Sequence, residues 1–122
     1  MKRDMELIRS LLLEIEEDER DRIIFNPDDS DKYTSKQIQY NLKLMVECGL
    51  IKGSVDNYWD GYKVVVSDLT WEGHDFLDAA RNDTIWNEAK EIAKQKGSHL
   101  SDLPIAVVTG ILVSVSKQIF GI

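Results

Sequence analysis

The chain has 122 residues, of which 43% are hydrophobic and 30% are charged, a balance typical of a globular domain and not of a disordered segment. Its 15 basic and 22 acidic side chains give a formal net charge of −7, which argues against a general polyanion binder. The single cysteine, Cys48, excludes an intrachain disulfide framework and any site built from several cysteines. No apolar segment follows the charged N-terminal residues, so we expect no secretory signal and a cytoplasmic location.

Residues 2–18 are expected to form the first helix, because their apolar side chains recur every three or four positions and so share one face. These apolar residues are Met5, Leu7, Ile8, Leu11, Leu12 and Ile15. Residues 23–25 are too few for a helix and suit a brief strand. Residues 26–31 contain a proline and three aspartates and are expected to form a solvated loop.

The clearest helix start lies at Thr34. Its side chain can accept from the first turn while Gln37, three residues later, bonds back to the Thr34 backbone, which is the capping-box pattern. This helix is expected to end at Gly49, which suits a left-handed cap. Its inward apolar residues are Ile38, Leu42, Met45 and Val46.

Two β-like runs follow, at residues 50–55 and 62–66, and the Asp60-Gly61 pair between them favours a tight hairpin. Because the connection over residues 56–61 is longer than two residues, we expect an open tip that carries Tyr58 and Trp59.

Three more helices are expected in the rest of the chain. The first is capped by Thr70 and would bury Trp71, the second begins at Asp83 and would bury Trp86, and the last runs over about residues 101–119. We expect Trp59, among polar residues, to stay outside the core. The apolar stretch of 14 residues at 103–116 is shorter than the roughly 18–20 residues that a membrane span requires, so we expect a buried or partner-facing helix.

The order helix, short strand, capped helix, hairpin and helix resembles a winged helix-turn-helix. Three segments make the resemblance more specific: MKRDMELIR at residues 1–9, LTWEGHDFLD at 69–78 and DTIW at 83–86. With these segments the chain resembles, over about residues 1–100, a small bacterial and phage family, domain of unknown function 2513. The resemblance implies a winged-helix fold and a relation to phage or prophage, and it carries no established activity.

We therefore expect a mainly α (α+β) fold, with a winged-helix domain and β-hairpin wing in residues 1–81. Residues 82–122 would form a two-helix C-terminal extension. Within the helix at residues 35–49, the side facing away from the core would carry Lys36, Gln37, Tyr40 and Lys43. These residue types could contact phosphates and base edges in a major groove, which is one candidate function.

A protein-interaction or self-associating module is the other candidate, and the one we favour. Acidic residues in the hairpin repel phosphate, whereas Tyr58 and Trp59 at its tip are of the kind enriched at interface hot spots. The last helix could form a homodimer through a seam of Ala106, Gly110 and Val113.

No catalytic pattern stands out in the sequence. His74 and Asp78 are one helical turn apart, but two ligands do not make a metal site. We expect a non-enzymatic protein with no cofactor, no metal and no small-molecule substrate, whose partner is either another protein or DNA.

Overall fold

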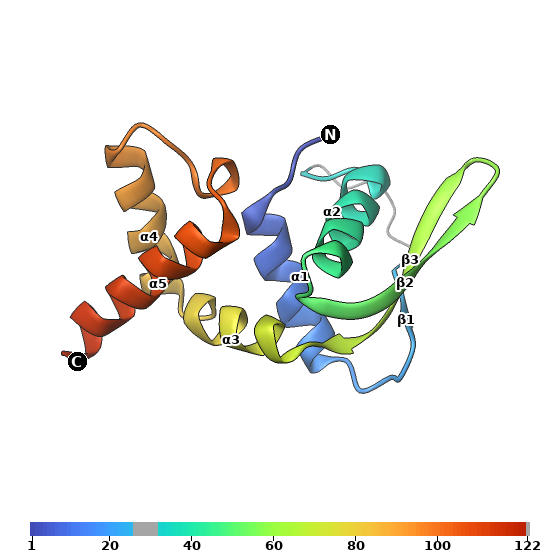
Figure 1. Cartoon of the computed structure of the whole chain (residues 1–122), viewed down its shortest axis with the longest axis horizontal. Helices are drawn as coiled ribbons and strands as arrows, with labels where there is room; N and C mark the ends of the chain where they lie inside the picture. The colour runs from blue at the N-terminus through green and yellow to red at the C-terminus, as the bar shows by residue number, and fades with distance from the viewer. Residues whose placement is uncertain (26–31, 122) are drawn as a thin grey trace. The chain divides into compact units, whose positions relative to one another are not determined.

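The computed structural model describes residues 1–25 and 32–121, so the loop expected at residues 26–31 lies outside the described residues. The described chain is a mixed α and β protein with five α-helices and a three-stranded antiparallel sheet. Figure 1 traces these elements along the chain. It divides into two compact units, residues 1–74 and 75–122. This division falls inside helix α3 (Trp71–Ala80), whereas the boundary predicted from the sequence lies just after that helix.

The elements of the first unit follow the predicted order, and each begins within three residues of its predicted start. They are α1 (Met5–Glu17), β1 (Ile23–Ile24), α2 (Ser35–Glu47), β2 (Ile51–Tyr58) and β3 (Gly61–Leu69). All six apolar residues predicted for the inner face of α1 are buried. The capping box of α2 is confirmed, because Gln37 N donates to Thr34 Oγ1 at 3.1 Å and Thr34 N donates to Gln37 Oε1 at 2.8 Å. Gly49 ends α2 with a φ of 82°, as expected.

The sheet has the strand order β1-β3-β2, and alternate residues of its central strand point to opposite faces. Val64 and Val66 are fully buried, and β3 contacts both α1 and α2, so this face packs on the helices. Tyr62 shares that face by the same alternation. Lys63 lies on the other face, together with Tyr58, and the hairpin extends beyond the two helices (Figure 1).

The hairpin differs from the prediction at its tip. Both strands continue to the pair Tyr58 and Gly61, which leaves a turn of two residues, Trp59 and Asp60, so the open tip expected over residues 56–61 is wrong. Gly61 has a φ of 146°, while no other type of residue in the described chain has a positive φ. An Asp-Gly pair at the centre of a hairpin favours a type I′ turn, in which both central residues have a positive φ. Here the central residues are Trp59 and Asp60, and neither has a positive φ, so the turn is of another type. Trp59 therefore lies on a short, constrained turn.

Helix α3 begins at a close junction with the turn that joins α2 to β2. The Thr70 hydroxyl donates to the carbonyl oxygen of Gly49 and accepts from Gly73 N at 2.9 Å, and Thr70 N donates to Leu50 O at 3.1 Å. A Cβ at Gly73 would overlap the Leu50 carbonyl oxygen, so only glycine allows this approach.

The prediction that Trp71 belongs to the core is wrong, because its side chain is 80% exposed. The buried residues of α3 are Gly73, Phe76, Leu77 and Ala80. At about 100° per residue they form one face, and Trp71 lies on the opposite side of the helix. The predictions for the other two tryptophans are confirmed, since Trp86 is 1% and Trp59 97% exposed.

The second unit contains α4 (Asp83–Gln95) and α5 (Ile105–Phe120), which pack on each other. The last helix starts later than predicted. Residues 100–102 form a separate 3-10 turn, Leu103 is extended, with φ −106° and ψ 147°, and Pro104 is the N-cap of α5. A residue that precedes proline is driven out of the helical region, which explains the late start. No helix in residues 1–25 or 32–121 is long and apolar enough to cross a membrane.

Candidate interaction surfaces

The α2 residues predicted to face DNA are largely engaged within the protein. The Gln37 side chain accepts the hydrogen bond of the capping box from Thr34 N. The Lys43 ammonium lies 4.9 Å from the centre of the Tyr62 ring, which is a cation–π contact between α2 and the hairpin. Tyr40 is half-buried. Lys36 is exposed, so of these four predicted residues it alone presents its side chain openly to solvent.

Gln39 has a structural role that the sequence pattern did not indicate. Its side chain is buried, its Nε2 donates to Phe25 O at 2.8 Å, and its Oε1 accepts from Val64 N at 2.9 Å. In the register that pairs Ile24 with Val65, Phe25 and Val64 would be the next pair of the β1–β3 ladder. The Gln39 carboxamide therefore connects these two backbone groups, next to the last pair of the β1–β3 ladder among the described residues.

A second buried amide, Asn41, fixes the N-terminal segment to α2. Its Oδ1 accepts from Asp4 N at 2.8 Å, and its Nδ2 donates to Gln37 O at 2.9 Å. Helical spacing could have predicted that both amides are buried, because Gln39 lies three residues before the buried Leu42 and Asn41 lies four residues before the buried Met45. The prediction missed them because it considered only apolar residues for the inner face.

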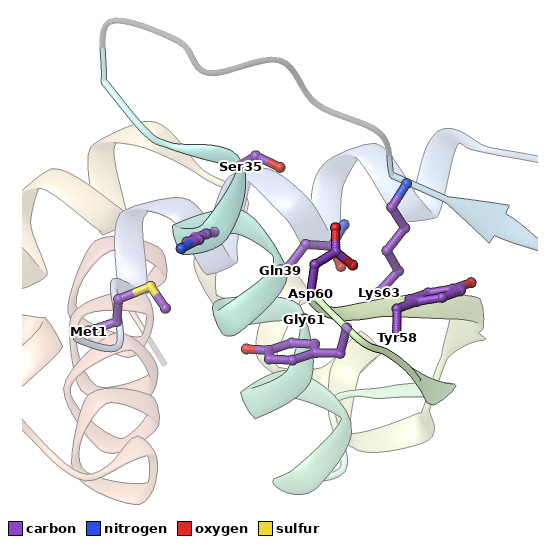
Figure 2. A pocket seen from close by; sticks show the side chains of 9 residues that line it. Met1, Ser35, Gln39, Tyr58, Asp60, Gly61 and Lys63 are labelled. Atoms are coloured by element: carbon purple, nitrogen blue, oxygen red, sulfur yellow. The ribbon is translucent and has the colours of Figure 1, made fainter.

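A cleft of about 370 Å³ lies between the start of α2 and the hairpin (Figure 2). Residues that line it include Ser35, Lys36 and Gln39 from α2 and Asp60, Tyr62 and Lys63 from the hairpin. Burial, followed by the neighbouring Tyr40 and Glu47, raises the pKa of the Tyr62 phenol.

The tip of the hairpin presents two aromatic side chains to solvent. Trp59 is 97% exposed and Tyr58 is 55% exposed, and Tyr58 points away from α2 in Figure 2. Both residues were predicted as interface candidates, and the structure brings them together at the turn. Neither ring folds back into the core of the described unit.

The predicted seam of α5, Ala106, Gly110 and Val113, is exposed. It lies away from the buried side of the helix, which carries Val108, Leu112 and Val115. A Cβ at Gly110 would meet no atom within 4 Å, so packing within the unit does not require a glycine there. A groove of about 390 Å³ beside Gly110 is lined by Ile92 of α4 and by several residues of α5.

The residues noted for their chemistry do not assemble into a larger group. Among the described residues, no three His, Cys, Asp or Glu side chains are grouped so that they could hold a metal ion. His74 and Asp78 are both exposed on α3. Desolvation raises the pKa of the Cys48 thiol, which opposes the thiolate form that a nucleophile needs.

The fold and these surfaces define a small mixed α and β protein with a projecting aromatic hairpin. Residues 2–99 match the model of the family described as "Hypothetical protein (DUF2513)", and the chain belongs to this family. It is 36% identical over 114 residues to a Haemophilus influenzae protein named "Uncharacterized protein", and the match covers 93% of this chain and 97% of that protein. No solved structure matches the chain. The resemblance to this family that the sequence indicated is thus confirmed.

The most specific part of the resemblance is the block LTWEGH at residues 69–74, and it contains the close junction at the start of α3. Thr70 and Gly73 hold this junction together, while Trp71 and His74 are exposed. Within this block, Thr70 and Gly73 therefore have a structural role, the attachment of α3 to the turn after α2.

Proposed function

We propose that the protein is a non-enzymatic, protein-binding module of the winged-helix type, and that the tip of the β2–β3 hairpin is its docking element. The observation that carries the proposal is the exposure of Trp59, 97%, on a turn of only two residues. A large aromatic ring on a constrained turn loses little conformational entropy on binding and gains much from burial in a partner. The Trp59 ring does not contribute to the core of the described chain.

A protein partner is favoured over duplex DNA by the charges and contacts around α2. Specific protein–DNA interfaces are strongly positive, whereas the hairpin carries Asp56, Asp60 and Asp68 beside its two lysines. Of the α2 side chains, Lys43 contacts Tyr62 and Gln39 is used inside the fold. Sequence-specific DNA binding through α2 and the hairpin is the alternative that the test below includes.

The test compares two variants of neighbouring hairpin residues. Immobilised wild-type protein and Asn57→Ala, a matched exposed control, should retain the same partner from an extract of the source cells, and Trp59→Ala should lose it. A random-sequence duplex library should show no enrichment on any of the three. Equal capture by all three proteins, or enrichment of a duplex that depends on Lys36, would contradict the proposal.

Self-association through α5 is a second candidate, and it is compatible with the first. Several apolar residues of α5 are exposed to 40% or more, namely Val107, Val113, Ile119 and Phe120. Val107 lines the groove beside Gly110, so a second helix bound in this groove could bury apolar area there.

A further inference from the structure

We propose that the outer edge of β2 binds an extended segment of the partner protein as an added β-strand, and that this segment carries an acidic and a basic side chain at the spacing of Lys52 and Asp56. The inference rests on the proposed function and names the partner's local chemistry. It follows from the direction of the backbone groups along β2, from the charges on this strand and from the exposed tip at its end.

The outer edge of β2 pairs with no other strand of the described chain. The strand order is β1-β3-β2, so β3 separates this edge from β1 and from Phe25, the last described residue after β1. Val64 N donates to Gln39 on the β1 side of β3, so Val64 and its register partner Val55 are not a hydrogen-bonded pair. The N–H and C=O of Val55 therefore point outward from β2, and those of Asn57 do so by alternation.

The charges on β2 determine which segment fits. The bulge near Lys52 lies in β3, which has the extra residue Ser67, so β2 keeps its alternation and Lys52 and Asp56 share one face. Lys52 is exposed and Asp56 is half-buried. On the inner side of β2, Asp68 of β3 is in register with Lys52. Likewise, Lys63 is in register with Asp56. Because like charges directly opposite each other are destabilising, a strand on the outer edge is favoured when it repeats this complement.

The same edge leads to the proposed docking element. β2 ends at Tyr58, Trp59 follows in the turn, and both side chains are exposed. A segment paired with β2 therefore continues to the aromatic tip, where Trp59 gains burial against it. In binding by strand addition, main-chain hydrogen bonds supply affinity and side-chain contacts supply specificity. A charged edge such as this one disfavours pairing with apolar strands, so Lys52 and Asp56 select their complement.

The first test selects peptides from a random decapeptide display library on the full chain. Wild-type protein should enrich β-prone peptides in which an acidic and a basic residue have the spacing of Lys52 and Asp56. N-methylation of alternate backbone amides of a selected peptide should abolish binding in one of the two alternations, because only one set of amides faces β2. Amide exchange at Val55 and Asn57 should slow when the peptide binds.

A charge exchange tests the side-chain pairing. The double variant Lys52→Glu/Asp56→Lys should bind a selected peptide about tenfold more weakly, and it should regain affinity for the same peptide with its acidic and basic residues exchanged. Glu91→Lys/Lys94→Glu on α4 is the matched control, because both residues are exposed and neither double variant changes the net charge. If the β2 variant does not fold, N-methylation and amide exchange with wild-type protein decide the question.

The outcomes separate this inference from the proposed function. Peptides that depend on Trp59 but tolerate both the charge exchange and N-methylation would show that the hairpin binds protein and that strand addition is wrong. Peptides that depend on the charges and on the backbone amides, but not on Trp59, would support strand addition and reject the tip as the docking element. Failure to enrich any peptide, or unchanged amide exchange at Val55, would overturn strand addition, while capture from the cell extract would still decide the proposed function.

Discussion

The side-chain oxygen of Gln39 accepts a hydrogen bond from the backbone N–H of Val64 at 2.9 Å, so a helix side chain takes the place of a strand partner. This contact joins α2 to the sheet, one residue beyond the pair Ile24 and Val65 of the β1–β3 ladder. Replacing Gln39 by Met keeps most of its volume but leaves Val64 N and Phe25 O without this partner. We expect a loss of about 1–3 kcal/mol in the free energy of unfolding.

Chemical denaturation measures this loss, and amide exchange at Val64 reports the local opening. Gln118→Met on α5 is the matched control, because Gln118 is exposed. A Gln39→Met variant as stable as that control would show that the contact contributes nothing.

Two glycines in helices should respond oppositely to the same substitution. Gly73→Ala places a Cβ against the Leu50 carbonyl oxygen and should destabilise the fold by about 1–3 kcal/mol or more. Gly110→Ala has open space and should stabilise α5 by up to about 1 kcal/mol through helix propensity. Thermal or chemical unfolding of the two variants decides the matter, and a neutral Gly73→Ala would mean that the α3 junction is looser than described.

The three tryptophans should differ in their contribution to stability and in their access to a quencher, according to how far each is buried. Trp86→Ala should lower the free energy of unfolding by about 3–5 kcal/mol, while Trp59→Ala and Trp71→Ala should change it little. Acrylamide quenching should show two accessible indoles and one protected indole. Protection of Trp71 in the free protein would contradict its position on the outer side of α3.

The Asp18 carboxylate should titrate unusually low. Hydrogen bonds from the Arg20 side chain, with Nη2 to Oδ2 at 2.6 Å, and from its backbone lower the pKa of Asp18 to about 2. Because the folded-state pKa lies below the unfolded value of about 3.9, the stabilisation is present above that value and is lost as the pH falls toward 2. Carboxyl NMR titration measures the pKa, and Arg20→Ala should return it to the ordinary range. An ordinary pKa in the wild-type protein would rule out the pair in solution.

Self-association through α5 should depend on close approach at Gly110. Gly110→Leu raises helix propensity, and its Cβ would meet no atom within 4 Å, so the protein should stay folded and become monomeric. Sedimentation velocity at tens of micromolar should show a wild-type dimer and a monomeric variant. A wild-type monomer at that concentration would remove this proposal.

The sequence predicted most of the elements because their signals are local. The capping box at Thr34, the apolar face of α1 and the left-handed Gly49 follow from spacing and residue type alone. The predictions were wrong where tertiary contacts, and not the local sequence, determine whether a side chain is buried. Trp71 is apolar but lies opposite the face that Gly73 brings into contact, and Gln39 is polar but buried because it completes a strand.

The candidate surface could be predicted in part. The polar neighbours of Tyr58 and Trp59 in the sequence predicted that both side chains are exposed, and the structure confirms this. The predicted ends of the two strands were wrong, because the strands continue to the pair Tyr58 and Gly61. The cleft could not be predicted, because it requires residues from α2 and from the hairpin, which pair with each other only in the folded chain. The cation–π contact of Lys43 with Tyr62 is of the same non-local kind.

Site-specific photo-crosslinking from the hairpin tip tests the central claim most directly. A photoreactive phenylalanine derivative at position 59 preserves an aromatic side chain there, and the same derivative at position 71 is the control, since Trp71 is also strongly exposed. We predict a discrete adduct with a protein from position 59 in source cells and none from position 71. Adducts with nucleic acid at position 59, or no adduct that distinguishes the two positions, would contradict a docking role for the hairpin.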